Sequence, residues 1–377
     1  MNKYLLFFIL SFTVFLTHAL YTKHALYGDG NGYYATSLSL LTGGTFNSQS
    51  VLDYLKNFQG KDYVFSRVFW DTDHNPYSIG TSLFWLPGLA LVSVFSGNPY
   101  NLIHELVPGV TGILLILGGL YFIERYLLSF FSPRTVFFTI LSLYLGSNLF
   151  YYSSFEPALS HQPAFFLIAF LLYWTHNFSY SKLNLISLGF LFGLLHITRI
   201  ADTLLLIPIF FTLKLDLKKL VFITLGGLVA ILPQLSVQFY SYGSLLRNFY
   251  VTESPNVWSF NLRNVVNYLF SYQKGLFIWS PVYLLGVYGL FKLQKLPMLV
   301  SILSLWLLGS FWSASSSMTA GFGQRLSFAA IPYFALGIVH IYEKVKINSQ
   351  IYLTSLFIAW NVFLTYGFYI LKWKNLS

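Results

Sequence analysis

The chain has 377 residues, of which 56% are hydrophobic, 20% are aromatic and only 9% are charged. Soluble proteins carry about 25% charged residues, so this composition excludes an ordinary soluble protein and predicts apolar surface that faces lipid. The net charge of +10 does not predict a nucleic-acid partner, because the Lys and Arg residues lie in short segments between apolar stretches, where they orient membrane helices.

Apolar stretches recur along the whole chain, and several of them lack charged residues over the roughly 20 positions that a helix needs to cross a bilayer. They predict an all-α, polytopic transmembrane bundle with about eleven spans, in which residues 1–377 form a single transmembrane domain. The predicted spans are 4–20, 105–122, 135–153, 162–176, 183–198, 201–213, 220–238, 276–291, 296–312, 327–342 and 350–370.

Two apolar stretches near the N-terminus allow more than one interpretation. Residues 4–20 fit a first span or a cleaved signal peptide, and their length favours a span. Residues 78–95 contain Pro87 and Gly88, and they fit a span or a helix that lies along the membrane surface. The second choice places the basic turn at Arg125 and the later Lys clusters on the cytoplasmic side, so we predict a juxtamembrane helix and a cytoplasmic N-terminus. Two long outer loops follow from this topology, over 21–104 and 239–275.

The first outer loop opens with a glycine-rich acidic segment at 27–34, where glycines flank Asp29 on both sides. Glycines permit backbone conformations that other residues resist, and they let a substrate approach closely. A simple turn with a side-chain hydrogen bond from Asp29 explains the same pattern. The functional interpretation makes Asp29 a catalytic carboxylate.

A second acidic residue, Glu156, lies near the outer end of a predicted helix and precedes Pro157. One interpretation is an acid at a helix N-terminus, and the other is a carboxylate that faces Asp29 across an outer cavity. His161 follows as a proton carrier, a phosphate ligand or an interfacial histidine.

Two arginines lie at predicted outer turns. Arg199 and Asp202 are three residues apart, which allows an ion pair on one helical face. Arg325 ends a long uncharged stretch, and its guanidinium suits bidentate phosphate binding or anchors a helix end at the membrane surface. No nucleotide-binding loop of the form GxxxxGK[ST], and no HExxH, CxxC or GxSxG motif, occurs in the sequence.

Taken in order, these segments resemble the GT-C integral membrane glycosyltransferases, which include protein O-mannosyltransferases and the lipid A aminoarabinose transferase. Bacterial members often read NKYPIG, LFSPRHGLFVWSP and SFGQR at three of these places. This chain has Pro76 and Ser78 in the first of them, where the family has Lys and Pro. The matching segments are Asp29–Ala35 (DGNGYYA), Asn75–Gly80 (NPYSIG), Glu156–His161 (EPALSH), Ile197–Arg199 (ITR), Leu269–Pro281 (LFSYQKGLFIWSP) and Gly321–Arg325 (GFGQR).

The resemblance implies an enzyme of the cell membrane that transfers a hexose or pentose from a polyprenyl-phosphate donor to an acceptor on the extracytoplasmic face, with inversion. It implies that Asp29 and Glu156 act in catalysis. A divalent cation, Mg²⁺ or Mn²⁺, between these two carboxylates stays open. The residues expected to bind the substrates are Tyr33, Tyr34, Tyr77, His161, Arg199, Lys274 and Arg325.

Two other functions compete with this one. A transporter or flippase of lipid-linked saccharides would carry its charged site near the membrane midplane, often within inverted repeats, whereas the candidate charges here gather at the outer ends of spans and no such repeat is found. A membrane scaffold without catalytic activity is the third option. The donor lipid is the expected partner, the acceptor stays open, and nucleic acid is not expected.

Overall fold

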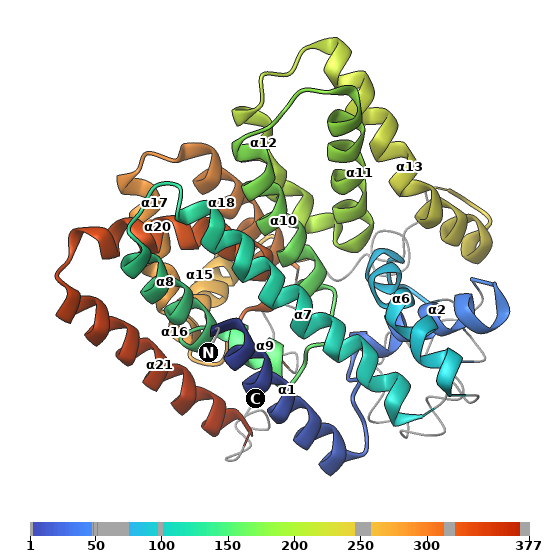
Figure 1. The fold of residues 1–377 in the computed structure, drawn as a ribbon, viewed down its shortest axis with the longest axis horizontal. Helices are drawn as coiled ribbons and strands as arrows, with labels where there is room; N and C mark the ends of the chain where they lie inside the picture. The colour runs from blue at the N-terminus through green and yellow to red at the C-terminus, as the bar shows by residue number, and fades with distance from the viewer. Residues whose placement is uncertain are drawn as a thin grey trace.

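The computed structural model describes residues 3–46, 48, 51, 75–96, 101–245, 258–312 and 321–369. All regular elements within this part of the chain are helical, which confirms the all-α prediction (Figure 1). Large parts of the predicted outer loops, residues 52–74 and 246–257, lie outside the described residues. The helices are α1 (Lys3–Thr22), α2 (Asp29–Gly43), α6 (Gly80–Phe95), α7 (Leu102–Leu127), α8 (Pro133–Leu145), α9 (Asn148–Ser154), α10 (His161–His176), α11 (Lys182–Thr198), η1 (Ile200–Leu206), α12 (Ile207–Thr212), α13 (Leu217–Tyr242), α15 (Leu262–Phe270), α16 (Leu276–Trp279), α17 (Val282–Lys292), α18 (Leu296–Phe311), η3 (Arg325–Ala330), α20 (Ile331–Lys344) and α21 (Ile347–Tyr369).

Five helical segments of the described chain are long and apolar enough to cross a membrane: α1, α7, α13, α21 and the continuous η3–α20 segment. Other apolar helices, such as α6, α11 and α18, have only 10–17 residues. The structure is therefore compatible with a membrane protein, while the number of about eleven spans stays a prediction.

Two predicted spans are divided by a break in the helix. The span expected over 135–153 becomes α8 and α9, because the Ser147 hydroxyl accepts a hydrogen bond from the backbone N–H of Leu149 at 3.2 Å and starts a new helix. The span expected over 276–291 becomes α16 and α17, since Pro281 has no N–H with which to continue the first helix. Both stretches lack charged residues, so charge placement alone predicts one span in each, although polar or helix-breaking residues stand at both breaks.

Helices α1 and α7 run antiparallel and are joined near both ends. At one end the Lys3 ammonium and the Tyr4 hydroxyl both donate to the Glu124 carboxylate. At the other end the backbone N–H of Ala25 donates to Glu105 Oε2 at 3.1 Å. The 20 residues of α1 span about 30 Å, which is roughly the thickness of the hydrocarbon layer.

Helices α11 and α13, which are separated in the chain by η1 and α12, pack parallel with their backbones touching, at the top of Figure 1. A Cβ atom at Gly189 would lie only 1.8 Å from the carbonyl oxygen of Ile223, and one at Gly226 only 1.9 Å from that of Ile186. Small residues at helix contacts are typical of packing in membranes. The opposite face of α13 exposes leucines, including Leu228, as a lipid-facing helix does.

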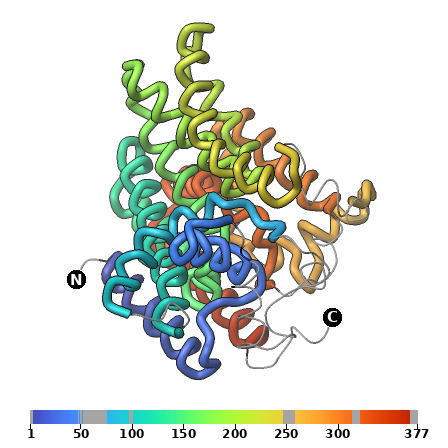
Figure 2. The backbone as a smooth tube through the Cα atoms, turned by 90° about the vertical axis from the view of Figure 1, so that its right-hand side faces the viewer, coloured from blue at the N-terminus to red at the C-terminus, as the bar shows by residue number. Residues whose placement is uncertain are grey.

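Helix α6 fixes the segment that precedes it against two other helices. The Ser82 hydroxyl donates to the Tyr33 carbonyl of α2 at 2.8 Å, and the Ile79 N–H donates to Gln234 Oε1 of α13 at 2.9 Å. Figure 2 shows α2 and α6, in blue and cyan, lying together on one side of the molecule. These contacts determine where Tyr77, just before α6, is held.

Candidate functional site

The acidic segment forms the start of a helix rather than an isolated turn. Gly28 has a φ of +48°, a conformation that favours glycine, and Asp29 begins α2 in the next position. Asn31 holds this start in place, because its backbone N–H and its side-chain amide both donate to the Gly28 carbonyl, at 3.1 and 3.3 Å. Asp29 therefore lies in the first turn of α2, where a negative charge is favoured by the helix dipole.

The next two glycines, Gly30 and Gly32, pack closely against other parts of the protein. A Cβ atom at Gly30 would lie 2.5 Å from the Ala158 carbonyl oxygen, and one at Gly32 would lie 2.1 Å from the Tyr77 ring. The expectation that a substrate approaches these glycines is therefore wrong for Gly30 and Gly32. Both close contacts bring candidate site segments against the start of α2.

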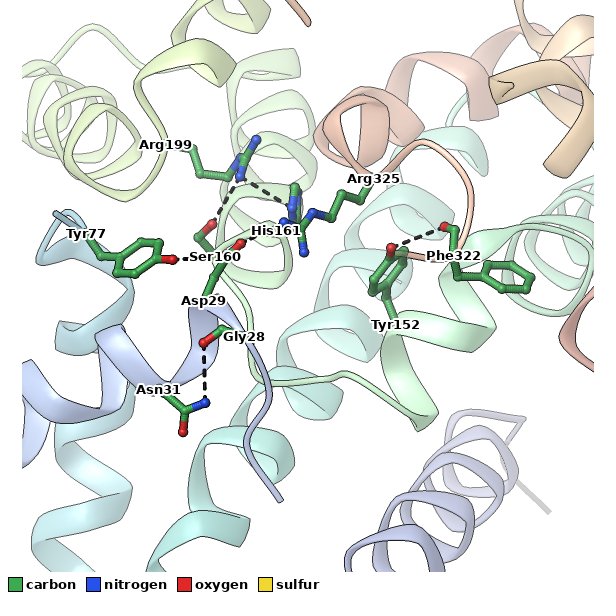
Figure 3. A network of polar contacts seen from close by, with 10 residues as sticks. All are labelled: Gly28, Asp29, Asn31, Tyr77, Tyr152, Ser160, His161, Arg199, Phe322 and Arg325. Carbon is green, nitrogen blue, oxygen red and sulfur yellow. Dashed lines mark hydrogen bonds and ion pairs between the residues drawn. The ribbon is translucent and has the colours of Figure 1, made fainter. Parts of the chain in front are cut away.

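Asp29 is held between an arginine and a tyrosine from distant parts of the chain (Figure 3). Arg325 Nη2 donates to Asp29 Oδ2 at 2.8 Å, and the Tyr77 hydroxyl donates to Oδ1 at 2.9 Å. The side chains of Asp29 and Arg325 are 33% and 25% exposed, so the pair is accessible from outside the protein. The partly exposed Arg325 thus reaches an acid 296 positions earlier in the chain.

Glu156 lies in a nonhelical link between α9 and α10, five residues before α10 begins, so the interpretation as an acid at a helix N-terminus is wrong. Its Oε1 accepts a hydrogen bond from the Tyr151 hydroxyl at 2.9 Å. The Pro157 carbonyl oxygen would meet a Cβ at Gly112 of α7 at 1.8 Å, so this link is wedged between α7 and α2. The two acidic residues are therefore carried by segments that touch each other, beside the middle of α7.

Tyr151 also connects Glu156 to the segment that carries Arg325. Its ring stacks on Phe322 at a centroid distance of 4.4 Å, while the neighbouring Tyr152 hydroxyl donates to the Phe322 carbonyl at 3.2 Å (Figure 3). Tyr151 was not among the predicted site residues, although a tyrosine pair lies five and four residues before the isolated Glu156.

The predicted ion pair between Arg199 and Asp202 is confirmed, with a distance of 2.8 Å between Nε and Oδ2. Arg199 Nη1 also donates to the Ser160 hydroxyl at 3.1 Å and lies 3.4 Å from His161 Nε2. Asp202 is completely buried and Arg199 is 14% exposed. Arg199 therefore links a buried acid to the segment that carries Glu156.

Lys274, between α15 and α16, belongs to the same electrostatic group. Its burial and the nearby Arg325 guanidinium lower its pKa to about 8, while the Glu156 carboxylate opposes this shift. Lys274 thus interacts with Arg325 and Glu156, and with a pKa of about 8 it loses its charge slightly above neutral pH.

The three predicted tyrosines take different places. Tyr33 is buried among the charged groups, where burial and Asp29 raise its pKa to about 12, against the opposing effects of Ser160, Arg199 and Arg325. Tyr77 contacts Asp29 directly. Tyr34 is 1% exposed and packs in the hydrophobic cluster of α2 and α6, so a substrate would contact it only after that cluster opened.

The structure gathers two acids and three cations around the start of α2, together with His161, Tyr33 and Tyr77. In the part of the chain that the structure describes, no three His, Asp or Glu side chains gather as a metal site would require. A cation shared by Asp29 and Glu156 alone stays a prediction. No protein-family model, curated protein or solved structure matches this chain, so function is argued from the site itself.

Proposed function

We propose that this chain is a membrane glycosyltransferase that moves a sugar from a polyprenyl-phosphate donor to an acceptor at the extracytoplasmic face. The observation that carries the proposal is the accessible Asp29 carboxylate, which is oriented from two sides by Arg325 and Tyr77. A base held in this orientation beside several cations suits a sugar transfer in which the leaving group is a phosphate.

Asp29 is the proposed general base. A carboxylate accepts about four hydrogen bonds, so the bonds from Arg325 and Tyr77 leave acceptor capacity on both oxygens. The acceptor hydroxyl gives its proton to Asp29 while its oxygen attacks the anomeric carbon of the donor. The bond from that carbon to the phosphate oxygen breaks, and polyprenyl phosphate leaves with the electron pair. Attack opposite to the leaving group inverts the anomeric centre.

The leaving phosphate is stabilised by the positive charges around Asp29. Arg325 offers five N–H donors, more than the one oxygen of Asp29 takes up, and a guanidinium matches a phosphate in a bidentate geometry. Lys274 adds a second charge close to Arg325. Arg199 stands near His161 and contributes a third. These cations also explain why an anionic donor would bind before the reaction.

Glu156 is the proposed second acid of the site. It interacts with Lys274 and Arg325 and is fixed by the Tyr151 hydroxyl, so it balances the cations and orients them. In this arrangement Asp29 takes the proton, and Glu156 keeps Lys274 charged for the phosphate.

The exposure of the site suits a lipid-linked donor. The side chains of Asp29 and Arg325 are 33% and 25% exposed, so a phosphate and a sugar can reach them from outside the bundle. The polyprenyl chain would then remain in the lipid beside the helices, and the proposal needs no transport of the donor through the bundle.

The test is sugar transfer by the purified protein, supplied with polyprenyl-phospho-sugars and candidate acceptors. Asp29→Asn is expected to lower kcat by about 10²–10⁴-fold, which is the usual contribution of a general base, while donor binding is retained. Asp216→Asn is the matched control, because Asp216 caps α13 at the cytoplasmic end predicted from the sequence and Asn caps a helix equally well.

Glu156→Gln is expected to weaken donor binding and to lower kcat less than Asp29→Asn does. Movement of the donor across vesicle membranes without transfer would favour the transporter instead. Transfer by Asp29→Asn within about ten-fold of the unchanged protein would remove the base assigned here.

A further inference from the structure

A pocket lies between the first residues of α1 and the last turn of α7, apart from the residues that surround Asp29. Its volume is about 410 Å³, within the range of pockets that hold small ligands. The residues that line it are Lys3, Tyr4, Tyr121, Glu124, Arg125 and Leu128. None of these residues takes part in the proposed glycosyl transfer.

The cations of this pocket outnumber its acid. The Lys3 ammonium and the Tyr4 hydroxyl both donate to Glu124, so this carboxylate is already paired within the protein. Lys3 also lies over the Tyr4 ring, with 5.3 Å between its nitrogen and the ring centroid. The exposed Arg125 makes no ion pair with any of the described residues. The pocket therefore carries one positive charge in excess.

The pocket lies at the first turn of α1 and the last turn of α7. Both helices are long and apolar enough to cross a membrane, so these helix ends reach the depth of the lipid headgroups. Leu5 and Leu6 are exposed on the adjoining turns of α1, where acyl chains would run. Tyr121 is exposed in α7, and tyrosines are enriched at the boundary between hydrocarbon and water.

From this geometry we infer that the pocket binds the headgroup of an anionic phospholipid. The phosphate contacts Arg125 and the ammonium of Lys3, the tyrosines pack on the glycerol region, and the acyl chains follow the apolar face of α1. The sequence predicts that this surface is cytoplasmic, and the cytoplasmic leaflet of a membrane is the one that carries anionic lipids. The inference does not depend on the proposed enzyme activity.

The experiment measures, by native mass spectrometry, how much phosphatidylglycerol or phosphatidylcholine stays bound to the full chain in detergent. Retention of phosphatidylglycerol over phosphatidylcholine is expected. Arg125→Gln should weaken this retention about five-fold, since one cation near a membrane surface contributes about 1 kcal/mol. Arg125→Lys keeps the charge and should keep most of the preference.

Lys292→Gln is the matched control, because Lys292 also ends an apolar helix and lies over a tyrosine ring, that of Tyr288, at 5.3 Å. Its loss should leave the lipid preference unchanged. Equal effects of Arg125→Gln and Lys292→Gln would overturn the site and indicate diffuse attraction. Displacement of the lipid by millimolar inorganic phosphate would overturn the assignment to a headgroup and indicate a site for soluble anions.

Discussion

The ion pair between Arg199 and Asp202 gives the sharpest prediction for stability. Replacing Arg199 by Gln removes the positive charge next to a carboxylate that is completely buried. One oxygen of Asp202, Oδ1, already lacks a hydrogen-bond partner within the described residues. The substitution therefore leaves a buried charge with little compensation, and we expect Arg199→Gln to destabilise the protein strongly.

The expected magnitude follows from the distance and the burial. At 2.8 Å and an effective dielectric constant of about 20, the attraction between the two charges is about 6 kcal/mol. Desolvation offsets part of it in the intact pair. Breaking a buried pair on one side usually costs about 3–5 kcal/mol, whereas removing both charges costs much less. The double variant Arg199→Gln/Asp202→Asn is therefore expected to be more stable than Arg199→Gln alone.

Unfolding in mixed micelles with increasing SDS, followed by tryptophan fluorescence, measures these differences. The control is Lys219→Gln, which breaks an ion pair with Asp216 that has the same spacing of three residues but is largely exposed. The control should change stability far less than Arg199→Gln does. If Arg199→Gln and Lys219→Gln proved equally mild, or if the double variant were less stable than Arg199→Gln, burial of the charge would not be the reason for the effect.

Three further predictions concern the site. Gly30→Ala should cost about 1–3 kcal/mol in unfolding free energy and lower transfer, because a backbone carbonyl lies 2.5 Å from the new methyl group, whereas Gly227→Ala meets its nearest atom at 3.5 Å and should be tolerated. Tyr77→Phe removes a hydrogen bond to Asp29 and should lower kcat about ten-fold while thermal stability stays unchanged; an unaltered kcat would show that the hydroxyl does not orient the base. Donor affinity should fall as pH rises through about 8, where Lys274 loses its charge, and Lys274→Arg should abolish that dependence; a KM for donor that rises equally in both proteins would exclude Lys274 as the titrating group.

Much of the helical architecture could be predicted from the sequence. Charged residues are rare in this chain, and the long uncharged stretches between them coincide with many of the helices. The ends of α11 and α13 lie near the predicted ones for this reason. The break at Ser147 was not predicted, because the stretch lacks charged residues, although Gly146 and Asn148 flank Ser147 as in a turn and the structure shows that Ser147 caps α9.

The sequence allowed several residues of the site to be predicted, but not most of the contacts between them. Asp29, Glu156 and Arg325 stood out because each is an isolated charge in an apolar or glycine-rich setting. The pairing of Asp29 with Arg325 joins positions 296 residues apart, and no local spacing reports such a contact. The pair of Arg199 with Asp202, three residues apart, was predicted because one helical turn brings them together.

Helix α1 is attached to α7 through Glu124 at one end and through Glu105 at the other. With both ends attached, α1 has a single register against α7 that satisfies both contacts. One residue inserted into its middle would lengthen it by about 1.5 Å and turn one end by about 100° relative to the other. Both attachments could not then form at once, so the register of this single helix determines where Ala25 lies, and the chain reaches Asp29 four residues later.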